Sequence, residues 1–476
     1  MKELSKKNKR KIKNNYRKRK KIVILGAGSL AFGLQTLVWL MRTDALKGME
    51  LMLVDVDTYK LERIFNLAKL LNDRWNANMK VNSSTKFKDS LTEADYIVIT
   101  VTRDREKCWI RDIEMAKKYN ISHVGENGGP GAFIHTARNL SIILPILEEI
   151  NNHCPNAFIL NFTNPMQRIC TAINKISSNR FMGLCHQIEY SYFILGIAFA
   201  KELNIEVKSD ILYDWSSDSE KANKYHEIID KSRESFDIRT AGLNHFTWLL
   251  DIIEKNAGRS IYNLCIEKLR SLPDWAEPLS QNVFKIFDYF PIAGDNHISE
   301  YMSYTSDLSS GTYAQYKIEN FDFDWYNVRK KRLWKKLDNI INGRENIDCL
   351  LQERSEKVEI IFSALEKNSN LYLESVNIPN NGCITNLPKG AIVDIPGIIG
   401  ADGITGLAIG DLPRTVAELC RRQLIINDMT VEAVLKGDIR LVYQLFALDP
   451  MVNNLNTAVK LADEYIKVNK DYLITF

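Results

Sequence analysis

Three side chains that could bind a divalent metal ion follow predicted strands in the middle of the chain. Cys185 and His186 end the β-rich run 181–186, and His245 follows a Gly-Leu-Asn stretch. One thiolate and one or two imidazoles are too few for a closed zinc site, which uses four protein ligands. They suit an open site for a borderline or hard divalent ion, completed by water and substrate oxygens. The alternative is that Cys185 packs as a small apolar side chain.

A glycine-rich turn near the start of the chain could bind phosphate groups. The stretch Gly26-Ala-Gly28-Ser29-Leu-Ala31 follows the strand-like run 21–25 and precedes an apolar helical stretch. Gly26 would allow a tight turn, Gly28 would let a diphosphate approach the backbone, and Ala31 would allow close helix–strand packing. The free N–H groups at the start of the helix favour an anion. We therefore assign Gly26, Gly28, Ser29 and Ala31 to a dinucleotide site.

An acidic residue follows the second strand-like run, 50–54, and indicates which dinucleotide is bound. A carboxylate at this place accepts hydrogen bonds from the adenosine ribose and repels a 2′-phosphate. Asp55 therefore favours NAD over NADP, and Asp57 is the rival for this role. The alternative is a glycine turn in an α/β fold that binds no nucleotide.

Strand-like and helical segments continue to alternate along the first part of the chain. The run 94–101 is a predicted strand, 132–151 is a long predicted helix, and 157–160 is another predicted strand. This alternation predicts an α/β fold with a doubly wound, parallel, Rossmann-type sheet. We place its boundaries at residues 21–195.

An asparagine is fixed by a proline at the end of the strand 157–160. Because Pro165 disfavours a helical backbone at the residue before it, Asn164 should be extended. An asparagine held at this edge beside a nicotinamide could hydrogen-bond a hydroxyl or carbonyl of a substrate. The alternative is an ordinary Asn-Pro turn.

Composition and charge exclude several classes of protein. The chain has 476 residues, 45% of them hydrophobic and 26% charged, which is typical of a globular protein with two or three domains. Residues 1–21 hold twelve basic side chains and one acidic one, whereas the remainder holds 51 basic and 58 acidic side chains. The body therefore has no general attraction for polyanions. The tail, residues 1–20, is expected to be disordered, although it could bind nucleic acid or an anionic membrane.

Two further features bear on the cellular compartment. The eight cysteines form no C-x-x-C pair, which fits a reducing environment. The uncharged run 22–41 resembles a signal peptide or membrane span, but its three glycines and its polar residues make a poor lipid-facing helix. We interpret that run as the glycine turn and its helix, and we expect a cytoplasmic protein with no membrane partner.

Taken together, the motifs from residue 22 to about residue 452 resemble those of glycoside hydrolase family 4, whose members depend on NAD and a divalent metal ion, usually manganese. The resemblance is carried by the glycine turn and by Asp55-Val-Asp57, Gly125-Glu-Asn-Gly-Gly-Pro-Gly131, Asn161-Phe-Thr-Asn-Pro165, Gly183-Leu-Cys-His186, Gly242-Leu-Asn-His245, Asn377-Ile-Pro-Asn-Asn-Gly382 and Asn386-Leu-Pro-Lys-Gly390. The Cys-His pair and the Asn-Leu-Pro-x-Gly stretch are most similar to the α-galactosidase branch. That branch is related to α-glucosidases, α-glucuronidases and α-galacturonidases.

The resemblance implies a redox-assisted cleavage of α-glycosides. NAD would take a hydride from C3 of the sugar, a base would remove the acidified C2 proton, and the group at C1 would be eliminated. Addition of water, reprotonation and return of the hydride would complete the cycle. The metal ion would hold O2 and O3 as a Lewis acid. The family also implies a homodimer or homotetramer and a small carbohydrate substrate. It further implies that residues 196–476 form a mixed α+β domain that supplies the substrate, metal and oligomer contacts.

Site residues are carried over from the family by position. Cys185 and His245 would bind the metal, and Asn164 would position the sugar hydroxyls. Glu126 and Arg138 match charged positions near the substrate. His186 stands where some relatives have an acidic proton donor, so it could donate a proton or only orient the metal site.

The general base is the open question within the family pattern, because the tyrosine base of some relatives has no evident counterpart here. The segment 290–297 corresponds to the part of the relatives that holds an acidic base candidate. Asp295 is our first choice for the base and His297 our second, and Glu300 also matches the α-galactosidase-like pattern. Either choice could instead be an ordinary polar loop residue.

Two other functions remain as alternatives. An NAD-dependent 2-hydroxyacid dehydrogenase of the lactate or malate type would share the fold, but it leaves Cys185 with His245 unexplained. A non-catalytic protein that binds NAD or nucleic acid would explain the basic tail and nothing in the cleft. Dependence of sugar release on manganese distinguishes the glycosidase from both.

Overall fold

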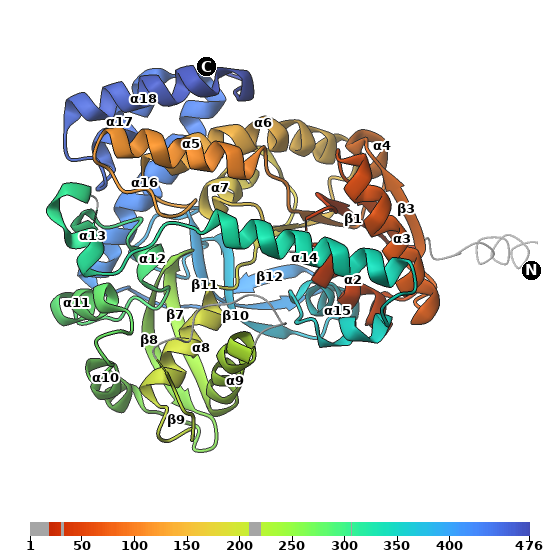
Figure 1. The fold of residues 1–476 in the computed structure, drawn as a ribbon, viewed down its shortest axis with the longest axis horizontal. Coiled ribbons are helices and arrows are strands. Elements are labelled where there is room, and N and C mark those ends of the chain that lie inside the picture. The colour runs from red at the N-terminus through yellow and green to blue at the C-terminus, as the bar shows by residue number, and fades with distance from the viewer. Residues whose placement is uncertain (1–18, 30–32, 209–219, 306) are drawn as a thin grey trace, which may run out of the picture.

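The computed structural model describes residues 19–29, 33–208, 220–305 and 307–476. Its centre is a sheet of 12 strands in the order β3-β2-β1-β4-β5-β6-β10-β11-β7-β8-β9, with β12 paired to β11 (Figure 1). The strands are β1 (Lys21–Leu25), β2 (Glu50–Val54), β3 (Lys80–Ser84), β4 (Tyr96–Ile99), β5 (Phe158–Asn161), β6 (Phe181–Gly183), β7 (Phe236–Leu243), β8 (Phe246–Glu254), β9 (Arg259–Ser260), β10 (Leu371–Pro379), β11 (Ile392–Gly400) and β12 (Gly403–Gly406).

The first six strands form a parallel sheet in the order 3-2-1-4-5-6. This is the strand order of a dinucleotide-binding fold, and the predicted Rossmann-type sheet is confirmed. The strand β1 shows why a continuous apolar run is needed. Ile22 and Ile24 pack into one apolar core with α2 and α3, while Val23 and Leu25 pack into a second core with α6 and α7. Both faces are buried, as a parallel sheet requires.

The second half of the chain extends the same sheet by antiparallel pairing. Asn377 of β10 pairs with Gly183 of β6, and β11 then joins β10 to β7. Strands of the predicted C-terminal domain therefore continue the Rossmann sheet, and the proposed boundary at residue 195 falls inside α8. A third apolar core lies among α8, α9, α10, α11, β7 and β8.

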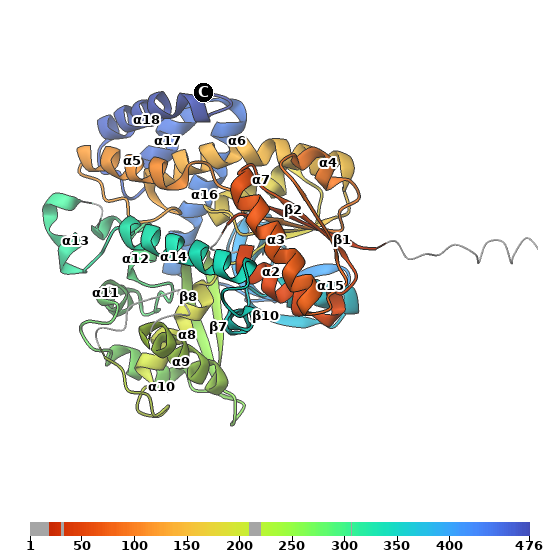
Figure 2. The ribbon, with the colours of Figure 1, turned by 45° about the vertical axis from the view of Figure 1, so that its right-hand side comes forward.

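Helices cover both faces of the sheet and its far end (Figures 1 and 2). Within the described residues they are α2 (Gly33–Arg42), α3 (Thr58–Arg74), α4 (Phe87–Leu91), α5 (Arg105–Lys118), α6 (Gly129–His153), α7 (Met166–Ile176), α8 (Gln187–Ala198), α9 (Glu220–Ser235), α10 (Tyr262–Arg270), α11 (Pro278–Phe287), α12 (Asp295–Ile298), α13 (Thr312–Gln315), α14 (Phe323–Ile341), α15 (Val358–Lys367), α16 (Arg414–Lys436), α17 (Ile439–Leu448) and α18 (Leu455–Asn469).

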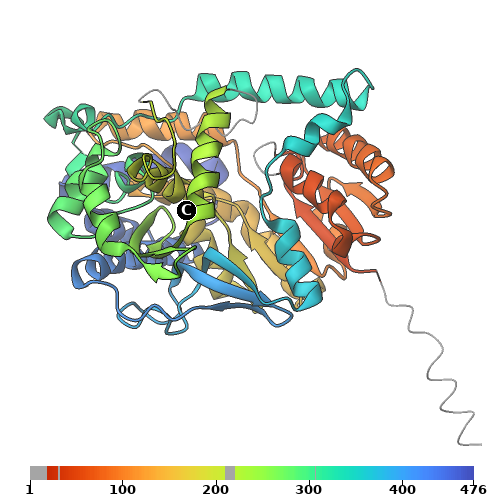
Figure 3. The ribbon, with the colours of Figure 1, turned by 90° about the horizontal axis from the view of Figure 1, so that it is seen from below.

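The long helix α14 runs along one side of the molecule as far as α3 (Figure 3). Asp338 near its end pairs with Arg63 of α3 through an Nε–Oδ1 bond of 2.7 Å. Lys330 nearer its start pairs with Glu106 of α5. The helix thus connects two parts of the Rossmann sheet's helical cover. Among the described residues, no helix has both the length and the apolar character needed to cross a membrane.

Candidate functional site

The predicted site residues sit where parallel strands end. Gly26 follows β1, Asp55 follows β2, Asn164 lies in the loop after β5, and Cys185 lies just after β6. Because these strands are parallel, their carboxyl ends meet at one edge of the sheet, which is where such folds bind ligands. His245 comes from the second half of the chain, at the tight turn between β7 and β8.

The glycine turn has the geometry that its sequence predicts. Gly26 has φ of 89°, and a Cβ atom there would lie 2.2 Å from the Thr100 carbonyl oxygen, so only glycine fits. Gly28 donates its N–H to Asp55 Oδ2 at 2.8 Å. Ser29 closes the turn through a bond of its N–H to the Gly26 carbonyl. Ala31 lies outside the described residues.

The two predicted metal ligands are neighbours. Cys185 Sγ lies 3.4 Å from His245 Nε2, although sixty positions separate them in the sequence. One ion could bind both atoms with ordinary metal–sulfur and metal–nitrogen bonds of about 2.0–2.3 Å. The donor set of one thiolate and one imidazole therefore fits an open site for a divalent ion.

His245 is held by contacts on two sides. Its backbone has φ of 62°, which is uncommon for a non-glycine residue and marks a constrained position. Its N–H donates to the side chain of Gln187 at the start of α8. Its Nδ1 lies 3.1 Å from the side-chain amide of Asn127. Such contacts to the second ring nitrogen orient a metal-binding histidine.

Burial acts on the protonation of both predicted ligands. It raises the pKa of the Cys185 thiol, so that the thiolate needs a nearby cation to form at neutral pH. It lowers the pKa of His245 well below its usual value, and the charge of His297 adds to this effect. His245 is therefore neutral, which is the form of imidazole that binds a metal.

Asn164 and Glu126 are also brought together. The Asn164 side-chain amide lies 3.5 Å from Glu126 Oε2, and Asn139 of α6 donates to the Asn164 carbonyl at 2.7 Å. Glu126 pairs with Arg105 through two bonds, of 2.6 and 2.8 Å. Burial alone would raise the pKa of Glu126, but the charge of Arg105 outweighs it and lowers that pKa to about 2.

His186 faces a buried acid. Its Nε2 pairs with Glu356, which precedes α15 and is 3% exposed. Burial would lower the pKa of His186, but the attraction of Glu356 outweighs burial and raises it. This pairing favours the protonated form of His186 beside Cys185, in agreement with a proton-donating role and equally with a structural one.

His297 lies directly against the metal-ligand pair. Its ring lies against that of His245, with 3.8 Å between the ring centroids and 31° between the ring planes. Its Nδ1 is 3.6 Å from Glu300 Oε1, and the ligand atoms of His245, His297 and Glu300 all lie within 4.8 Å of one another. The side chain of His297 is 39% exposed, so part of its ring is open to a substrate.

Two predicted site residues are engaged elsewhere. Both carboxylate oxygens of Asp295 accept bonds at the start of α11, from the N–H groups of Leu279 and Ser280 at 2.7 Å. Arg138 is 1% exposed and pairs with Asp112 of α5 and Asn469 of α18. The structure thus places the Asp295 carboxylate at the start of α11 and Arg138 in an internal ion pair, and the catalytic and substrate roles of these residues stay predictions.

Three residues near the site were not assigned a role from the sequence. Asn127, which contacts His245, lies inside the glycine-rich segment 125–131 and could have been found there. Glu356 and Arg105 carried no sequence signal, because their partners are 170 and 21 positions away. Only the folded chain shows these pairs.

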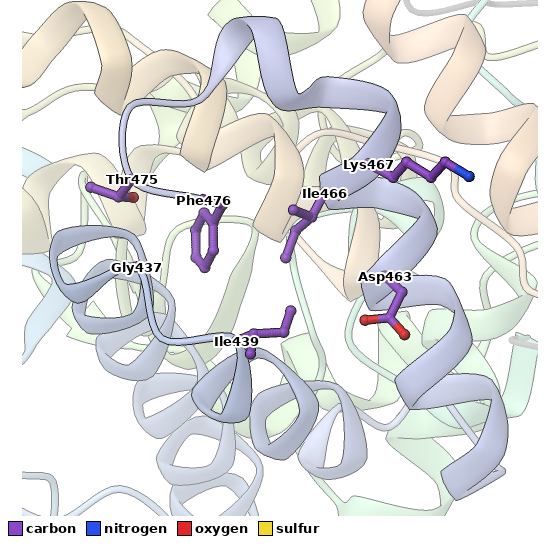
Figure 4. A pocket seen from close by; sticks show the side chains of 7 residues that line it. All are labelled: Gly437, Ile439, Asp463, Ile466, Lys467, Thr475 and Phe476. Atoms are coloured by element: carbon purple, nitrogen blue, oxygen red, sulfur yellow. The ribbon is translucent and has the colours of Figure 1, made fainter.

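A surface cavity of about 400 Å³ lies far along the chain from these residues, at the C-terminus (Figure 4). It lies among the end of α16, the start of α17, α18 and the last residues. Its lining comprises Gly437, Ile439, Asp463, Ile466, Lys467, Thr475 and Phe476. None of these is a predicted site residue, and the lining is mostly apolar.

Comparisons with known proteins agree with the geometry. Residues 21–192 match the model of the family 4 glycosyl hydrolases, and residues 240–452 match that of the family 4 glycosyl hydrolase C-terminal domain. An alpha-glucosidase of Erwinia rhapontici is 27% identical, over 95% of this chain and 98% of its own length. An alpha-galactosidase of Bacillus subtilis is 26% identical, over 95% and 99%.

Solved structures share the fold over nearly the whole chain. The glucosidase lplD of Bacillus subtilis has a TM-score of 0.78 and 20% identity, covering 94% of this chain and 99% of its own. A 6-phospho-alpha-glucosidase from gut microorganisms, solved with NAD and Mn²⁺, has a TM-score of 0.73 and 19% identity, covering 96% and 99%. The two family matches together span most of the sequence, and they lie on the two halves whose strands build the common sheet and bring Cys185 to His245. The chain therefore belongs to the family 4 glycosyl hydrolases.

Proposed function

We propose that this glycosidase hydrolyses α-glycosides with the help of NAD and a divalent metal ion, by oxidation at C3, deprotonation at C2, elimination at C1 and addition of water. Relatives named alpha-glucosidase, alpha-galactosidase and alpha-galacturonidase support an α-linked sugar. When bound, NAD accepts and returns the C3 hydride, and the ion acts as a Lewis acid toward O2 and O3.

The chain's own residues would hold the cofactor and the sugar. The turn at Gly26, Gly28 and Ser29 offers backbone N–H groups to the diphosphate, and Asp55 offers its carboxylate to the ribose. Cys185 and His245 would hold the metal ion. Asn164, fixed by Asn139 and Glu126, would orient the sugar hydroxyls at the same edge of the sheet.

Proton transfer would use the two histidines that flank the metal-ligand pair. His297 is the better-placed base, because its ring contacts that of His245 and is partly exposed, whereas both oxygens of Asp295 are occupied. His186, paired with Glu356, would donate the proton to the leaving group. This choice reverses the order in which the sequence ranks Asp295 and His297.

The observation that carries the proposal is the 3.4 Å approach of Cys185 Sγ to His245 Nε2 at the ligand-binding edge of a Rossmann sheet. The deciding experiment is hydrolysis in heavy water, with NAD, manganese and a thiol reductant. Deuterium at C2 of the released sugar is expected, because C2 is deprotonated in each turnover. Only protium at C2, together with no isotope effect for a C2-deuterated substrate, would refute the elimination mechanism.

The two alternatives give different results in simple assays. A 2-hydroxyacid dehydrogenase would reduce NAD stoichiometrically, whereas the glycosidase needs only catalytic NAD. A nucleic-acid-binding protein would depend on the basic tail, of which residues 1–18 lie outside the described residues. Removal of residues 1–20 should leave sugar release unchanged.

The proposal extends to organisation in the cell. We assign residues 21–195 to the cofactor domain and 196–476 to the substrate domain, in a cytoplasmic homodimer or homotetramer without a nucleic-acid or membrane partner. Exposed apolar side chains on the C-terminal helices support self-association: Leu448, Leu455 and Val459 are 46%, 73% and 40% exposed. Sedimentation velocity would test the oligomer.

A further inference from the structure

A buried glutamate beside the proposed base is anchored by one of its oxygens only. Glu300 is 3% exposed. Its Oε2 accepts the N–H groups of Asn127 at 2.8 Å and Gly128 at 2.9 Å, just before α6. Two backbone donors at the start of a helix hold a carboxylate firmly. The position of the second oxygen, Oε1, is therefore fixed as well.

The glycine-rich segment before α6 is shaped around this glutamate. A Cβ atom on Gly125 would lie 2.3 Å from Glu300 Oε1, and one on Gly128 would lie 2.4 Å from the Glu300 carbonyl oxygen. Either side chain would displace Glu300. The glycines at these positions therefore make room for a carboxylate of the same chain.

The second oxygen of Glu300 faces the proposed base. Glu300 Oε1 is buried and accepts no hydrogen bond, and the Nδ1 of His297 lies 3.6 Å from it. A buried carboxylate oxygen without a donor is costly, so a small movement that closes this distance is favourable. His297 is three residues earlier in the chain, on α12, so the two side chains lie on adjacent turns.

We propose that Glu300 is a positioning residue that holds the Nδ1–H of His297 and leaves His297 Nε2 as the atom that accepts the C2 proton. This inference rests on the proposed function. After the C3 hydride has left for NAD, the C2 proton moves to Nε2, and the C2–H electron pair becomes the enolate. Nε2 later returns the proton to C2. A carboxylate that fixes the tautomer of a catalytic histidine has the same role in hydrolase triads.

The competing role for Glu300 is that of a metal ligand. The ligand atoms of His245, His297 and Glu300 lie within 4.8 Å of one another, so a cation could bind among them. The two roles differ in one measurable quantity. A metal ligand contributes to the affinity for Mn²⁺, whereas a positioning residue for His297 contributes to kcat.

The variant Glu300→Gln separates these roles. Its amide oxygen must stay with the two N–H donors of the helix start, so its NH₂ group replaces Oε1 and donates toward His297. That contact favours the wrong tautomer, with the proton on Nε2. We expect kcat to fall on the order of 10³-fold or more. KM and the dissociation constants for NAD and Mn²⁺ should stay within about threefold, and deuterium incorporation at C2 should fall with kcat.

A matched control is Glu359→Gln. Glu359 is also a buried glutamate near a helix start, with one oxygen bonded to Ser355 and the other without a hydrogen-bond partner. It should leave kcat within about threefold. His297→Asn should reduce kcat at least as far as Glu300→Gln. The C2 isotope effect should rise in Glu300→Gln, and a purely structural change would not selectively slow that step.

Each other outcome has a definite meaning. A loss of Mn²⁺ affinity of more than tenfold in Glu300→Gln, measured by calorimetry, would make Glu300 a ligand and overturn the inference, as would an unchanged kcat. Absence of C2 exchange in the wild-type enzyme, together with no isotope effect for a C2-deuterated substrate, would instead refute the proposed function. If Glu300→Gln fails to fold, the wild-type ring ¹H–¹⁵N spectrum still decides, with His297→Asn for assignment. A proton on Nδ1 of His297 supports the inference, and one on Nε2 overturns it.

Discussion

Two glycine-rich segments of this enzyme use similar backbone chemistry for different purposes. In the turn after β1, Gly28 donates its N–H to Asp55 at 2.8 Å; in the segment before α6, Gly128 donates its N–H to Glu300 at 2.9 Å. Asp55 is half-buried and can exchange this contact for a ligand, whereas Glu300 is buried. In both segments, glycines mark a place where another group approaches the backbone closely. Whether that group is a ligand or a side chain of the same protein depends on a carboxylate that is distant in the sequence.

The largest expected effect comes from filling the second segment. In Gly125→Ala the new Cβ would lie 2.3 Å from the Glu300 carboxylate, so this carboxylate must leave the position that it now has beside His297. We expect kcat to fall on the order of 10³-fold, with about 1–3 kcal/mol of stability lost to overpacking. The dissociation constant for NAD, measured by fluorescence titration, should stay within about threefold. Wild-type kinetics in this variant would show that the close fit of the glycine segment to Glu300 has no catalytic role.

The next effect concerns acid stability of the second segment, where Glu126 is buried against Arg105. Its pKa of about 2 lies below the usual 4.5, so its ionised form stabilises the fold above about pH 4.5. That stabilisation is lost as the pH falls from about 4.5 to about 2. The shift corresponds to about 3 kcal/mol.

Denaturant unfolding of the wild type and Glu126→Gln would measure this effect. The variant should be less stable by about 3 kcal/mol at pH 7. The difference between the two proteins should narrow as the pH is lowered toward 3. A constant difference over this range would mean that the loss comes from the unpaired Arg105 alone.

Filling the first segment should have a smaller and separate effect. In Gly28→Ala the Cβ would lie 2.8 Å from Asp55 Oδ2 and 2.9 Å from Lys60 Cβ, where a diphosphate would also approach. The dissociation constant for NAD should rise about 10- to 100-fold, which is about 1.4–2.8 kcal/mol. Mn²⁺ affinity by calorimetry should be unchanged. If both variants lost NAD and Mn²⁺ binding together, the two segments would not be independent.

These two segments also show how much the sequence could predict. The strands 21–25 and 50–54 were predicted from apolar runs, and the structure has them with the same ends. Cys185, His245 and Asn164 were predicted from motifs at strand ends, where topology alone brings side chains together. The pairing of β10 with β6 was not predicted, because it joins residues 194 positions apart.

The sequence could not show a side chain's partners where they are distant along the chain. Nothing near Asp295 shows that α11, which begins at Pro278, receives its carboxylate, and nothing near Arg138 indicates Asp112 and Asn469 as partners. The family motifs predicted a catalytic role for Asp295 and a substrate contact for Arg138, and a charged side chain suits either role. Burial and pairing, which only the fold provides, show that the Asp295 carboxylate accepts bonds at the start of a helix.

The smallest expected effect tests a third carboxylate at a helix start. Asp295 accepts bonds from Leu279 and Ser280, and burial together with the nearby Glu277 raises its pKa well above the usual value. Asp295→Asn keeps one acceptor oxygen, loses one capping bond and removes the repulsion from Glu277. The free energy of unfolding should therefore change by no more than about 1 kcal/mol. Because both oxygens of Asp295 already accept hydrogen bonds from α11, kcat should stay within about threefold, whereas Glu300→Gln, at a carboxylate with one oxygen facing a histidine, should lower it strongly. Steady-state kinetics and C2 exchange, measured for the two variants side by side, decide which carboxylate acts in catalysis.

If Asp295→Asn lost catalysis and exchange while folding normally, Asp295 would be the base. A carboxylate oxygen without a hydrogen-bond donor would then no longer distinguish a functional carboxylate from one that caps a helix.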